Sequence, residues 1–388
     1  MNFASMASNP YHTTADNIKK VYLATDGLPQ AVMLKGYGNE GHDSANSEYA
    51  DIAEREGGVE DFQELIKIAH DYNTEIGIHV NAQEAYPEAA SFNEEMLQKP
   101  FSNGWGWLDQ SQVIDKLWDL SSQARWKRFV QLYDRINGTD FYSRKWPDAV
   151  ENSLGEVNAT KEEIKKDAES REDNMDFIYL DVWYQDAWET RQIADEINSL
   201  GWRFSTEFSA EGEYDSTWQH WSTDAAYGGA TSKGYNSDII RFIRNDQRDS
   251  QVLNYPQFGG TADNPLLGGY RLYGFEGWGG DKDYDNYILQ TFNQNLPTKF
   301  LQHYYVTDWE NYEEGESPVG NHEKQITLRN DSGDEVVVTR NEEQRSDDNI
   351  ERTITLNGKK VLDNVTYLLP WTDNQDGSEK LYLSLIHI

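Results

Sequence analysis

From about residue 30 to residue 310, short apolar runs alternate with longer segments of helical periodicity. The segment VEDFQELIKIAHDY at 59–72 carries apolar side chains at i, i+3, i+4 and i+7, which predicts a helix whose buried face contains Phe62, Leu65, Ile66 and Ala69. Further helices are expected at 112–120, at 124–136 and after Asp186. In the last case a D-x-x-E capping box starts the pattern and Gly201 ends it, with Ile193, Ile197 and Leu200 on the apolar face.

The apolar runs are expected to be strands. They read AVMLKG, EIGIHV, DFIYLDVW and RFSTEF, at residues 31–36, 75–80, 176–183 and 203–208. Continuously apolar strands separated by helices are typical of a parallel sheet covered on both faces. Such repeats either close into a barrel or form an open doubly wound sheet. The number of units and the lack of a Gly-rich phosphate turn favour the closed α/β form, a (β/α)8 TIM-like barrel.

Two segments depart from this alternation. Residues 143–175 are highly charged and are expected to form a solvated helical excursion without a chemical role. After about residue 320, short alternating strands are separated by polar turns, which predicts the start of a β-sandwich. We therefore expect a barrel domain at 1–318 and an incomplete β-sandwich domain at 319–388. Both ends of the sequence look cut, which indicates a fragment of a longer protein.

Composition narrows the class of partner. The 388 residues carry a formal net charge of −34, from 68 acidic and 34 basic side chains, so their field repels nucleic-acid backbones and anionic lipid headgroups. Thirteen Trp, 23 Tyr and 14 Phe supply flat rings that suit core packing and also sugar binding. No Cys occurs, so disulfides and thiolate metal sites are excluded. No apolar run approaches the length of a membrane span, and the first residues lack a signal-peptide pattern.

An acid stands at the end of two consecutive predicted strands, Asp181 in DFIYLDVW and Glu207 in RFSTEF. The carboxyl ends of parallel strands meet at one mouth of the sheet, where ligands bind. Two carboxylates on adjacent strands can lie about 5 Å apart, the separation used by retaining glycosidases. A structural interpretation is also open, because Asp181 could cap the next helix and Glu207 could pair with an arginine.

Other polar side chains are expected at the same mouth. His42 and Asp43 follow the first run, and His79 and Asn81 stand at the end of the second. Imidazoles, amides and carboxylates can hydrogen-bond sugar hydroxyls. The residue types would also permit a metal at His42, Asp43 and His79, but no fixed metal-ligand spacing supports it, so we predict a sugar and no metal.

The loop NGWGWLDQ at 103–110 places Trp105 and Trp107 two residues apart beside glycines. Aromatic rings on such hinges can close over a ligand and stack on sugar faces. Packing of the pair on the barrel rim is the alternative. Spacing alone does not decide between them.

Several segments together resemble the catalytic region of a known enzyme family. In chain order they are NFASMASNP, LATDGLPQAVMLKGYGNEGHDS, GIHVNAQEAYPEA, NGWGWLDQ, YLDVW, WETRQIADEINSLGWRFSTEFS, EYDSTWQHW, LLGGY and FEGWGG. This series resembles the endo-α-N-acetylgalactosaminidases of glycoside hydrolase family 101. These enzymes release Gal-β-1,3-GalNAc from Ser or Thr of mucin-type glycoproteins. The resemblance covers about residues 1 to 310 and continues more loosely into the β region.

The resemblance implies a retaining mechanism on a (β/α)8 barrel, here lacking its first strand. It implies Asp181 as the nucleophile and Glu207 as the acid/base. By the same resemblance His42, Asp43 and His79 hold the disaccharide, and the mobile tryptophan pair is Trp105 and Trp107. It also implies an extracellular or cell-surface, monomeric protein that acts on O-glycosylated glycoproteins without a cofactor. A structural calcium ion cannot be derived from the sequence.

The chain also departs from the family pattern. The loop after Asp181 is shorter than expected, which puts the leaving-group side of the site in question, and the charged insert is longer. Two other functions stay open on the residues alone. One is a carbohydrate-binding remnant without hydrolysis, and the other is a metal-dependent hydrolase built on His42, Asp43 and His79.

Overall fold

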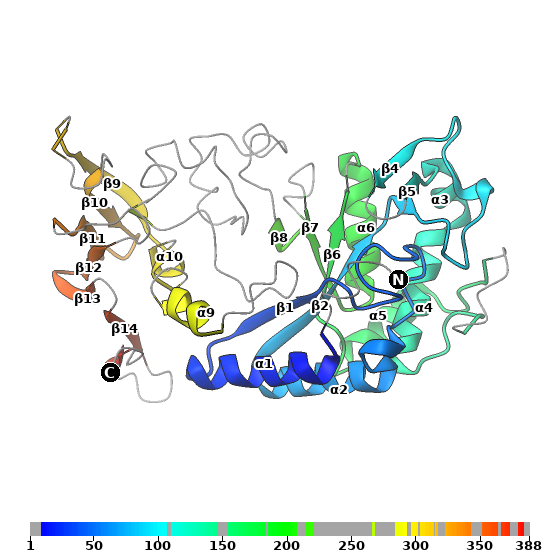
Figure 1. Cartoon of the computed structure of the whole chain (residues 1–388), viewed down its shortest axis with the longest axis horizontal. Coiled ribbons are helices and arrows are strands. Elements are labelled where there is room, and N and C mark those ends of the chain that lie inside the picture. Colours follow the sequence, from blue (N-terminus) through cyan, green and yellow to red (C-terminus); the bar gives the residue numbers. More distant parts are fainter. Residues whose placement is uncertain are drawn as a thin grey trace. The chain divides into compact units, whose positions relative to one another are not determined.

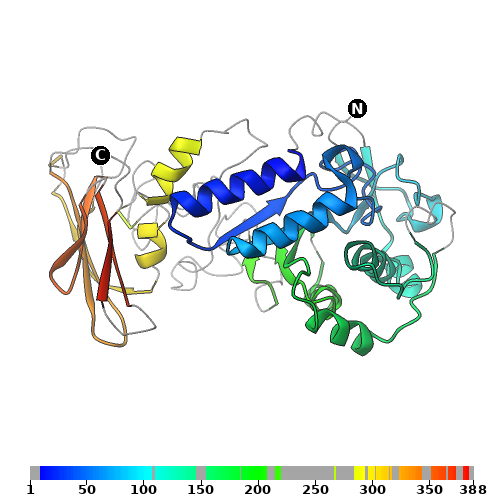
Figure 2. The ribbon, with the colours of Figure 1, turned by 90° about the horizontal axis from the view of Figure 1, so that it is seen from below.

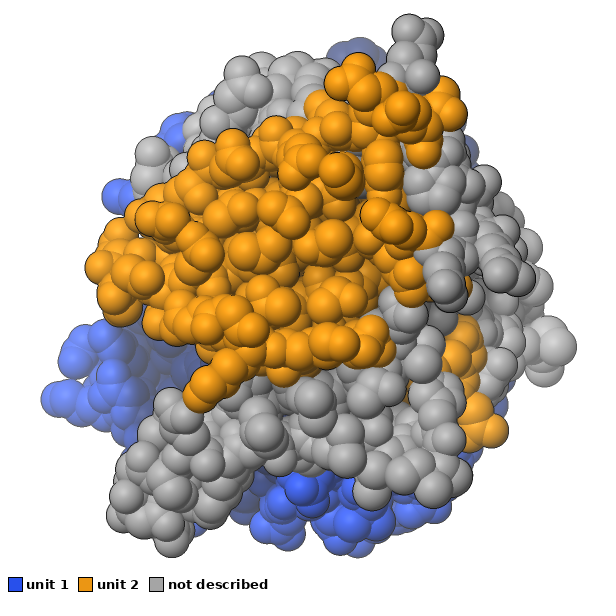
Figure 3. Space-filling view, turned by 90° about the vertical axis from the view of Figure 1, so that its left-hand side faces the viewer, with its two compact units in different colours: residues 1–219, 276–281 blue, residues 220–275, 282–388 orange. Residues whose placement is uncertain are grey.

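The computed structural model describes fourteen segments of the chain, drawn as coloured ribbon in Figure 1. They are residues 9–106, 110–145, 154–183, 185–207, 215–219, 266–267, 284–292, 296–301, 303–313, 315–316, 323–342, 351–363, 366–372 and 379–383. The chain divides into two compact units, coloured separately in Figure 3. The first comprises residues 1–219 and 276–281, and the second 220–275 and 282–388.

The first unit contains a five-stranded sheet in the order β1-β2-β6-β7-β8 among the described residues. All neighbouring strands pair in parallel. The strands are β1 (Gln30–Leu34), β2 (Thr74–Asn81), β6 (Phe177–Asp181), β7 (Arg203–Thr206) and β8 (Trp218–Gln219). Each strand expected from the apolar runs is present, and a parallel sheet in a mixed α/β domain is confirmed.

Helices separate these strands in the chain, and α1 and α2 lie side by side along the sheet (Figure 2). They are α1 (Tyr11–Ala24), α2 (Gly58–Asp71), α3 (Lys116–Ser122), α4 (Ala124–Asn137), α5 (Lys161–Glu169) and α6 (Ala187–Ser199), with 3-10 turns η2 (Glu54–Glu56) and η3 (Glu94–Met96). The expected face of α2 is buried. The capping box at Asp186 starts α6, and Gly201 follows its end with φ of 77°. Both details follow the sequence pattern.

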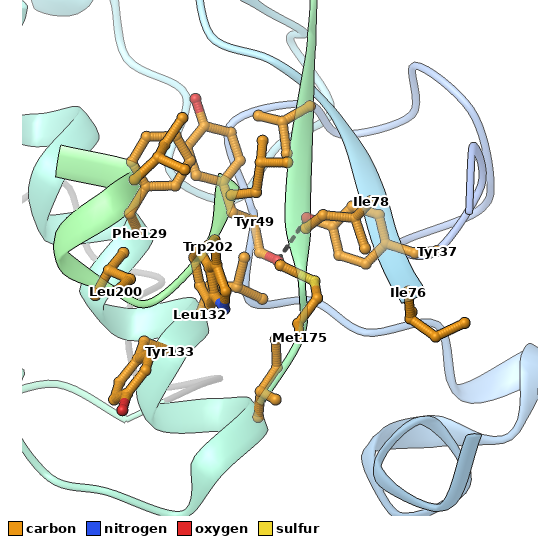
Figure 4. Close-up of a cluster of buried hydrophobic side chains, with 14 of the residues drawn as sticks. Tyr37, Tyr49, Ile76, Ile78, Phe129, Leu132, Tyr133, Met175, Leu200 and Trp202 are labelled. Atoms are coloured by element: carbon orange, nitrogen blue, oxygen red, sulfur yellow. Dashed lines mark hydrogen bonds between the residues drawn. The ribbon is translucent and has the colours of Figure 1, made fainter. Parts of the chain in front are cut away.

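One continuous core joins the sheet to its helices (Figure 4). Ile76 and Ile78 of β2 reach it from the strand side, and Phe129 and Tyr133 reach it from α4. Phe129 stacks on Tyr49, with ring centroids 5.1 Å apart. Each fully buried apolar side chain contributes about 1.5–3 kcal/mol, so this cluster fixes the sheet whose strand ends carry the site.

Two expectations are wrong in detail. The helix expected at 112–120 begins only at Lys116, because the Asp115 side chain caps it through the Trp118 N–H, and β5 (Gln110–Val113) precedes it. The charged segment 143–175 is not simply a solvated excursion. It contains α5, which a Thr160 capping box starts and whose Ile164 and Ala168 are buried in the main core. Positions 146–153 lie outside the described residues.

The described part of the second unit contains α9 (Tyr284–Gln290), α10 (Leu296–Leu301) and an antiparallel sheet in the order β15-β14-β13-β12-β11-β10-β9. Its strands are β9 (Tyr305–Asn311), β10 (Glu323–Arg329), β11 (Glu335–Arg340), β12 (Arg352–Leu356), β13 (Lys359–Asp363), β14 (Thr366–Thr372) and β15 (Glu379–Leu383). In β11, alternate residues are buried, as the strand pattern predicts. The sheet begins before residue 319, and the expected boundary there stays a prediction.

No helix among the described residues is long and apolar enough to span a membrane.

Candidate functional site

The two acids singled out in the sequence lie next to each other at the carboxyl end of the parallel sheet. Asp181 is the last residue of β6, and Glu207 directly follows β7. The register pairs Leu180 with Thr206, so Glu207 stands opposite Asp181. Adjacent strands lie about 4.8 Å apart, and paired residues point to the same face of a sheet. The two carboxylates therefore project from the same mouth.

Two hydrogen bonds donated by backbone N–H groups tie the two strand ends together. The N–H of Val182 donates to Glu207 Oε2 over 3.0 Å, and the N–H of Glu207 donates to the Leu180 carbonyl over 2.9 Å. Val182 has φ of 51°, a left-handed conformation that is rare for a β-branched residue and costs on the order of 1–3 kcal/mol. The strained turn after Asp181 thus aims an N–H at the neighbouring carboxylate.

Asp181 does not cap the following helix. The N-cap of α6 is Asp186, so the capping role considered for Asp181 is excluded. Instead, Asp181 Oδ2 lies 3.0 Å from His79 Nε2. His79 stands on β2 and stacks on Tyr179 with ring centroids 5.6 Å apart, which fixes the orientation of the imidazole beside the acid.

His42 and Asp43 reach the same mouth from the loop after β1. Their side chains are 10% and 4% exposed, and His42 Nε2 lies 3.2 Å from Asp43 Oδ2. The rings of His42 and His79 meet edge to face, 4.5 Å apart. Asp43 has φ of 53°, so the loop turns sharply inward at this residue. The structure therefore brings together four of the predicted site residues, His42, Asp43, His79 and Asp181.

Burial controls the protonation of this group. Burial, reinforced by the nearby carboxylates of Asp181, Glu84 and Glu207, raises the pKa of Asp43 to about 8, although Lys35 opposes it. Burial, with His79 and Lys35, lowers the pKa of His42 well below its usual value. At neutral pH Asp43 is therefore a protonated donor and His42 a neutral ring. A neutral donor and acceptor set suits an uncharged, hydroxyl-bearing ligand.

Replacement of Asp43 by Asn is expected to stabilise the protein at neutral and alkaline pH. The folded state keeps the Asp43 proton up to about pH 8, whereas the unfolded chain releases it near 3.8. Between these values the folded state binds more protons, so the carboxyl costs more stability as pH rises, and the full cost is reached above about pH 8. Asn lacks this cost and tolerates the positive φ. Urea unfolding at about pH 4, 6 and 8 should show a gain that grows with pH. A gain that is constant over this range would contradict the burial of a protonated Asp43.

The possible ligand atoms of His42, Asp43, His79 and Asp181 lie within 4.8 Å of one another, a spacing that could also hold a metal ion. A second such group among the described residues, at His12, Asp61 and Glu64, is largely exposed. The donor chemistry therefore permits a metal ion at the mouth as well as a sugar.

The other predicted site residues have different surroundings. Asn81 is only 1% exposed. Its side-chain Oδ1 accepts the backbone N–H groups of Gln83 and Glu84, and its side-chain Nδ2 donates to the Glu84 carboxylate. A direct contact of Asn81 with sugar stays a prediction, and this geometry gives the side chain a structural role. Trp105 lies on β4 (Asn103–Gly106) with its side chain exposed. Trp107 lies outside the described residues.

Sequence reasoning missed two residues near this mouth. Glu84 is buried three residues after the end of β2, and the pattern Asn81-x-x-Glu84 could have indicated a carboxylate that folds back on the strand end. Tyr86 is also buried, and its hydroxyl has no hydrogen-bond partner among the described residues. Burial, followed by the Asp43 and Glu84 charges, raises the Tyr86 pKa, so the phenol stays a neutral donor near the site.

Comparison with known protein families finds two matching profiles. The profile described as endo-alpha-N-acetylgalactosaminidase matches residues 1–150 and 148–288. The profile described as glycosyl hydrolase 101 beta sandwich domain matches residues 294–384.

A curated relative from Renibacterium salmoninarum, provisionally named endo-alpha-N-acetylgalactosaminidase, is 31% identical over 372 residues. The match covers 96% of this chain and 20% of the relative, so the chain spans about a fifth of the length of that protein.

Two solved structures show the same general fold. The alpha-N-acetylgalactosaminidase NagBb from Bifidobacterium bifidum, in its GalNAc complex, has a TM-score of 0.54 at 12% identity over 89% of this chain and 52% of its own. The maltogenic alpha-amylase AmyB from Thermotoga neapolitana has a TM-score of 0.51 at 10% identity over 97% and 92%.

Proposed function

Because the chain belongs to the endo-α-N-acetylgalactosaminidase family, glycoside hydrolase family 101, we propose that it is the catalytic region of a retaining, endo-acting glycosidase. The proposed reaction releases Gal-β-1,3-GalNAc from Ser or Thr of O-glycosylated, mucin-type proteins. The proposed enzyme is monomeric, works outside the cell or at its surface, and folds as a (β/α)8 barrel followed by a β-sandwich.

The juxtaposition of Asp181 and Glu207 carries this proposal. They end neighbouring parallel strands, opposite each other in register, and this arrangement supports a separation near the roughly 5 Å of retaining enzymes rather than the 6.5–9.5 Å of inverting ones. After burial, the charges of both acids contribute to the raised pKa of Asp43, in keeping with two carboxylates near that buried carboxyl.

In the proposed first step, a carboxylate oxygen of Asp181 bonds to the anomeric carbon of GalNAc. The glycosidic bond breaks, and its electron pair takes the proton of Glu207 to give the Ser or Thr hydroxyl. In the second step Glu207 removes a proton from water, the water oxygen bonds to the same carbon, and Asp181 leaves as a carboxylate. His79, 3.0 Å from Asp181, orients the nucleophile throughout.

The described groups at the mouth suit a neutral sugar. Protonated Asp43, neutral His42 and the Tyr86 hydroxyl provide donors and acceptors without net charge. The exposed indole of Trp105 can stack on a pyranose face. A glycoprotein is therefore favoured over an anionic substrate, in keeping with the net charge of −34.

The direct test compares Glu207→Gln with the parent in the intact protein on two substrates. With a Ser-linked Gal-β-1,3-GalNAc glycopeptide, which needs a proton on the leaving oxygen, kcat/KM should fall by about 10²- to 10⁴-fold. With a dinitrophenyl glycoside of the same disaccharide, whose leaving group needs no proton, kcat/KM should stay within about threefold. Equal losses on both substrates would contradict the acid/base assignment. Disaccharide binding without any release by the parent would instead indicate a carbohydrate-binding remnant.

A metal-dependent hydrolase is a second candidate, favoured by the close spacing of His42, Asp43, His79 and Asp181. In that case a chelator would abolish activity and a divalent ion would restore it. The retaining glycosidase proposed here should keep its full activity in chelator.

A further inference from the structure

The chain turns sharply after Asp181, and a backbone N–H of this turn reaches the acid that follows the next strand. The N–H of Val182 donates to Glu207 Oε2 over 3.0 Å, with Val182 at φ of 51°. A β-branched residue keeps this left-handed conformation only where the surrounding structure holds it there. Contacts close to the turn are therefore needed to keep the Val182 N–H on Glu207.

The side chain of Trp183, the next residue, anchors the turn in the core. It is 2% exposed and belongs to the main core cluster. Its indole N–H donates to the Thr190 hydroxyl of α6 over 2.9 Å, and the guanidinium of Arg125 on α4 lies 5.5 Å from the centroid of its ring. Two helices thus hold the indole, and with it the direction of the main chain directly after Val182.

Thr190 closes the segment between the turn and α6. Its hydroxyl accepts the Trp183 indole N–H and lies 3.4 Å from the Gln185 carbonyl, to which it donates. Its backbone N–H donates to the Asp186 carbonyl over 3.0 Å. Thr190 is 0% exposed, so its side chain does not touch a substrate. An effect of this hydroxyl on the reaction therefore has to pass through Trp183 and the turn.

The bond from Val182 distinguishes the two oxygens of the Glu207 carboxyl. In a carboxylic acid the carbonyl oxygen accepts hydrogen bonds and the other oxygen carries the proton. Because Oε2 accepts the Val182 N–H, the proton of the acid is on Oε1. The backbone N–H of Glu207 is also bonded, to the Leu180 carbonyl over 2.9 Å. The residue is therefore held both at its main chain and at the oxygen that carries no proton.

We infer that Trp183 and Thr190 are positioning residues that keep the Val182 N–H on Glu207 Oε2, so that Oε1 presents its proton to the leaving oxygen. The inference rests on the proposed function for the role of Glu207 as acid/base. In the first step the Oε1–H bond breaks and its proton goes to the glycosidic oxygen. In the second step Oε1 takes a proton from the attacking water.

The nucleophile has separate supports. Asp181 is the register partner of Asn81 in the parallel sheet, and its carboxylate lies 3.0 Å from His79. Neither contact involves the turn or the Trp183 indole. Loosening the indole should therefore impair proton transfer to the leaving group and spare the attack on the anomeric carbon. This difference separates a positioning role from a general structural one.

Hydrogen exchange in the intact protein tests the restraint without using activity. Thr190→Val keeps the shape of the side chain but leaves the Trp183 indole N–H without its acceptor. Exchange of the Val182 amide should become about tenfold faster or more, while amides of β2 keep their rates. Thr190→Ser keeps the hydroxyl and should stay within about twofold of the parent. Unchanged Val182 exchange in Thr190→Val would overturn the inference.

Thr25→Val is the matched control for Thr190→Val. Thr25 is also buried in the first unit, at 3% exposure, and its hydroxyl donates to the Val21 carbonyl over 2.8 Å. It lies at the end of α1 and makes no printed contact with the turn after β6. Exchange of the Val182 amide should be unaffected. Equal acceleration in the two variants would show general loosening of the unit and overturn the inference.

A comparison of two substrates tests the consequence for the reaction. On a Ser-linked Gal-β-1,3-GalNAc glycopeptide, Thr190→Val should lower kcat/KM about tenfold, because the leaving oxygen needs the proton of Glu207. On a dinitrophenyl glycoside of the same disaccharide, kcat/KM should stay within about twofold. Thr190→Ser should restore the parent rate on the glycopeptide. Equal losses on both substrates, or no rescue by Ser, would overturn the inference.

A double variant tests whether Thr190 acts through Glu207. Adding Thr190→Val to Glu207→Gln should lower kcat/KM on the glycopeptide by less than about twofold, since the acid is already absent. A further tenfold loss would overturn the inference. A parent that hydrolyses neither substrate would refute the proposed function, whereas the exchange of the Val182 amide would still decide whether Thr190 holds the turn.

Discussion

Asp181→Asn in the intact protein is expected to lower kcat on an aryl Gal-β-1,3-GalNAc-α glycoside by about four orders of magnitude or more. The amide has the shape of the carboxylate but cannot form the glycosyl ester. It still meets His79 and leaves the register of β6 unchanged, so the affinity for the disaccharide should stay within about threefold. The measurement pairs steady-state kinetics with calorimetric binding of the free disaccharide.

Asp176→Asn is the matched control for this variant. Asp176 stands just before the opposite end of the same strand, where Oδ2 accepts the Ile76 N–H at 2.7 Å and lies 3.0 Å from His70 Nε2. The amide oxygen of Asn can keep the Ile76 bond, so kcat should change by less than about twofold. Release of disaccharide by Asp181→Asn at near the parent rate would show that Asp181 is not the nucleophile.

Arg125→Met is expected to destabilise the first unit by about 3–5 kcal/mol at neutral pH. Arg125 is 7% exposed, and it lies 2.9 Å from Asp119 Oδ2 and 3.0 Å from Glu196 Oε2. Its removal takes from two buried carboxylates the cation that both of them pair with. The guanidinium also lies 5.5 Å from the ring of Trp183, two residues after Asp181, so this network supports the turn that carries the nucleophile.

Urea unfolding measures this loss of unfolding free energy, and its dependence on pH shows whether the buried carboxylates cause it. Burial raises the pKa of Asp119 even beside Arg125, so without Arg125 this carboxylate should take up a proton readily as pH falls, and the loss should shrink near pH 4. Lys161→Met is the matched control, because Lys161 pairs with Asp195 at 2.8 Å and lies over Trp126 but is largely exposed. Its cost should stay within about 1 kcal/mol. Equal losses for both variants would contradict a dominant role for buried charge.

Much of the fold could be read from local patterns. Continuously apolar runs located β1, β2, β6 and β7, and the Asp186 capping box located the start of α6. These patterns depend only on residues close together in the sequence, so they can be recognised without knowledge of tertiary contacts. The placement of Asp181 and Glu207 at one mouth followed from a general rule for parallel strands, and the register agrees with it.

Features that depend on contacts distant in sequence were missed. The charge of residues 161–169 hid a helix whose two apolar side chains, Ile164 and Ala168, enter the main core. The hydrogen bond from the Trp105 N–H to Glu84 joins residues 21 positions apart, and the hydrophobic periodicity of the sequence does not indicate it. The raised pKa of Asp43 likewise depends on burial and on the charges of Asp181, Glu84 and Glu207, which only the fold brings together.

The most direct test of the central claim is to locate the covalent intermediate. In Glu207→Gln, a dinitrophenyl glycoside should still form the glycosyl-enzyme, and its hydrolysis should be slow because no base activates water. Acid quenching followed by peptide mapping should then find a mass increase of one disaccharide on Asp181. A label on any other residue, or no label while dinitrophenol is released, would contradict the pairing of Asp181 as nucleophile with Glu207 as acid/base.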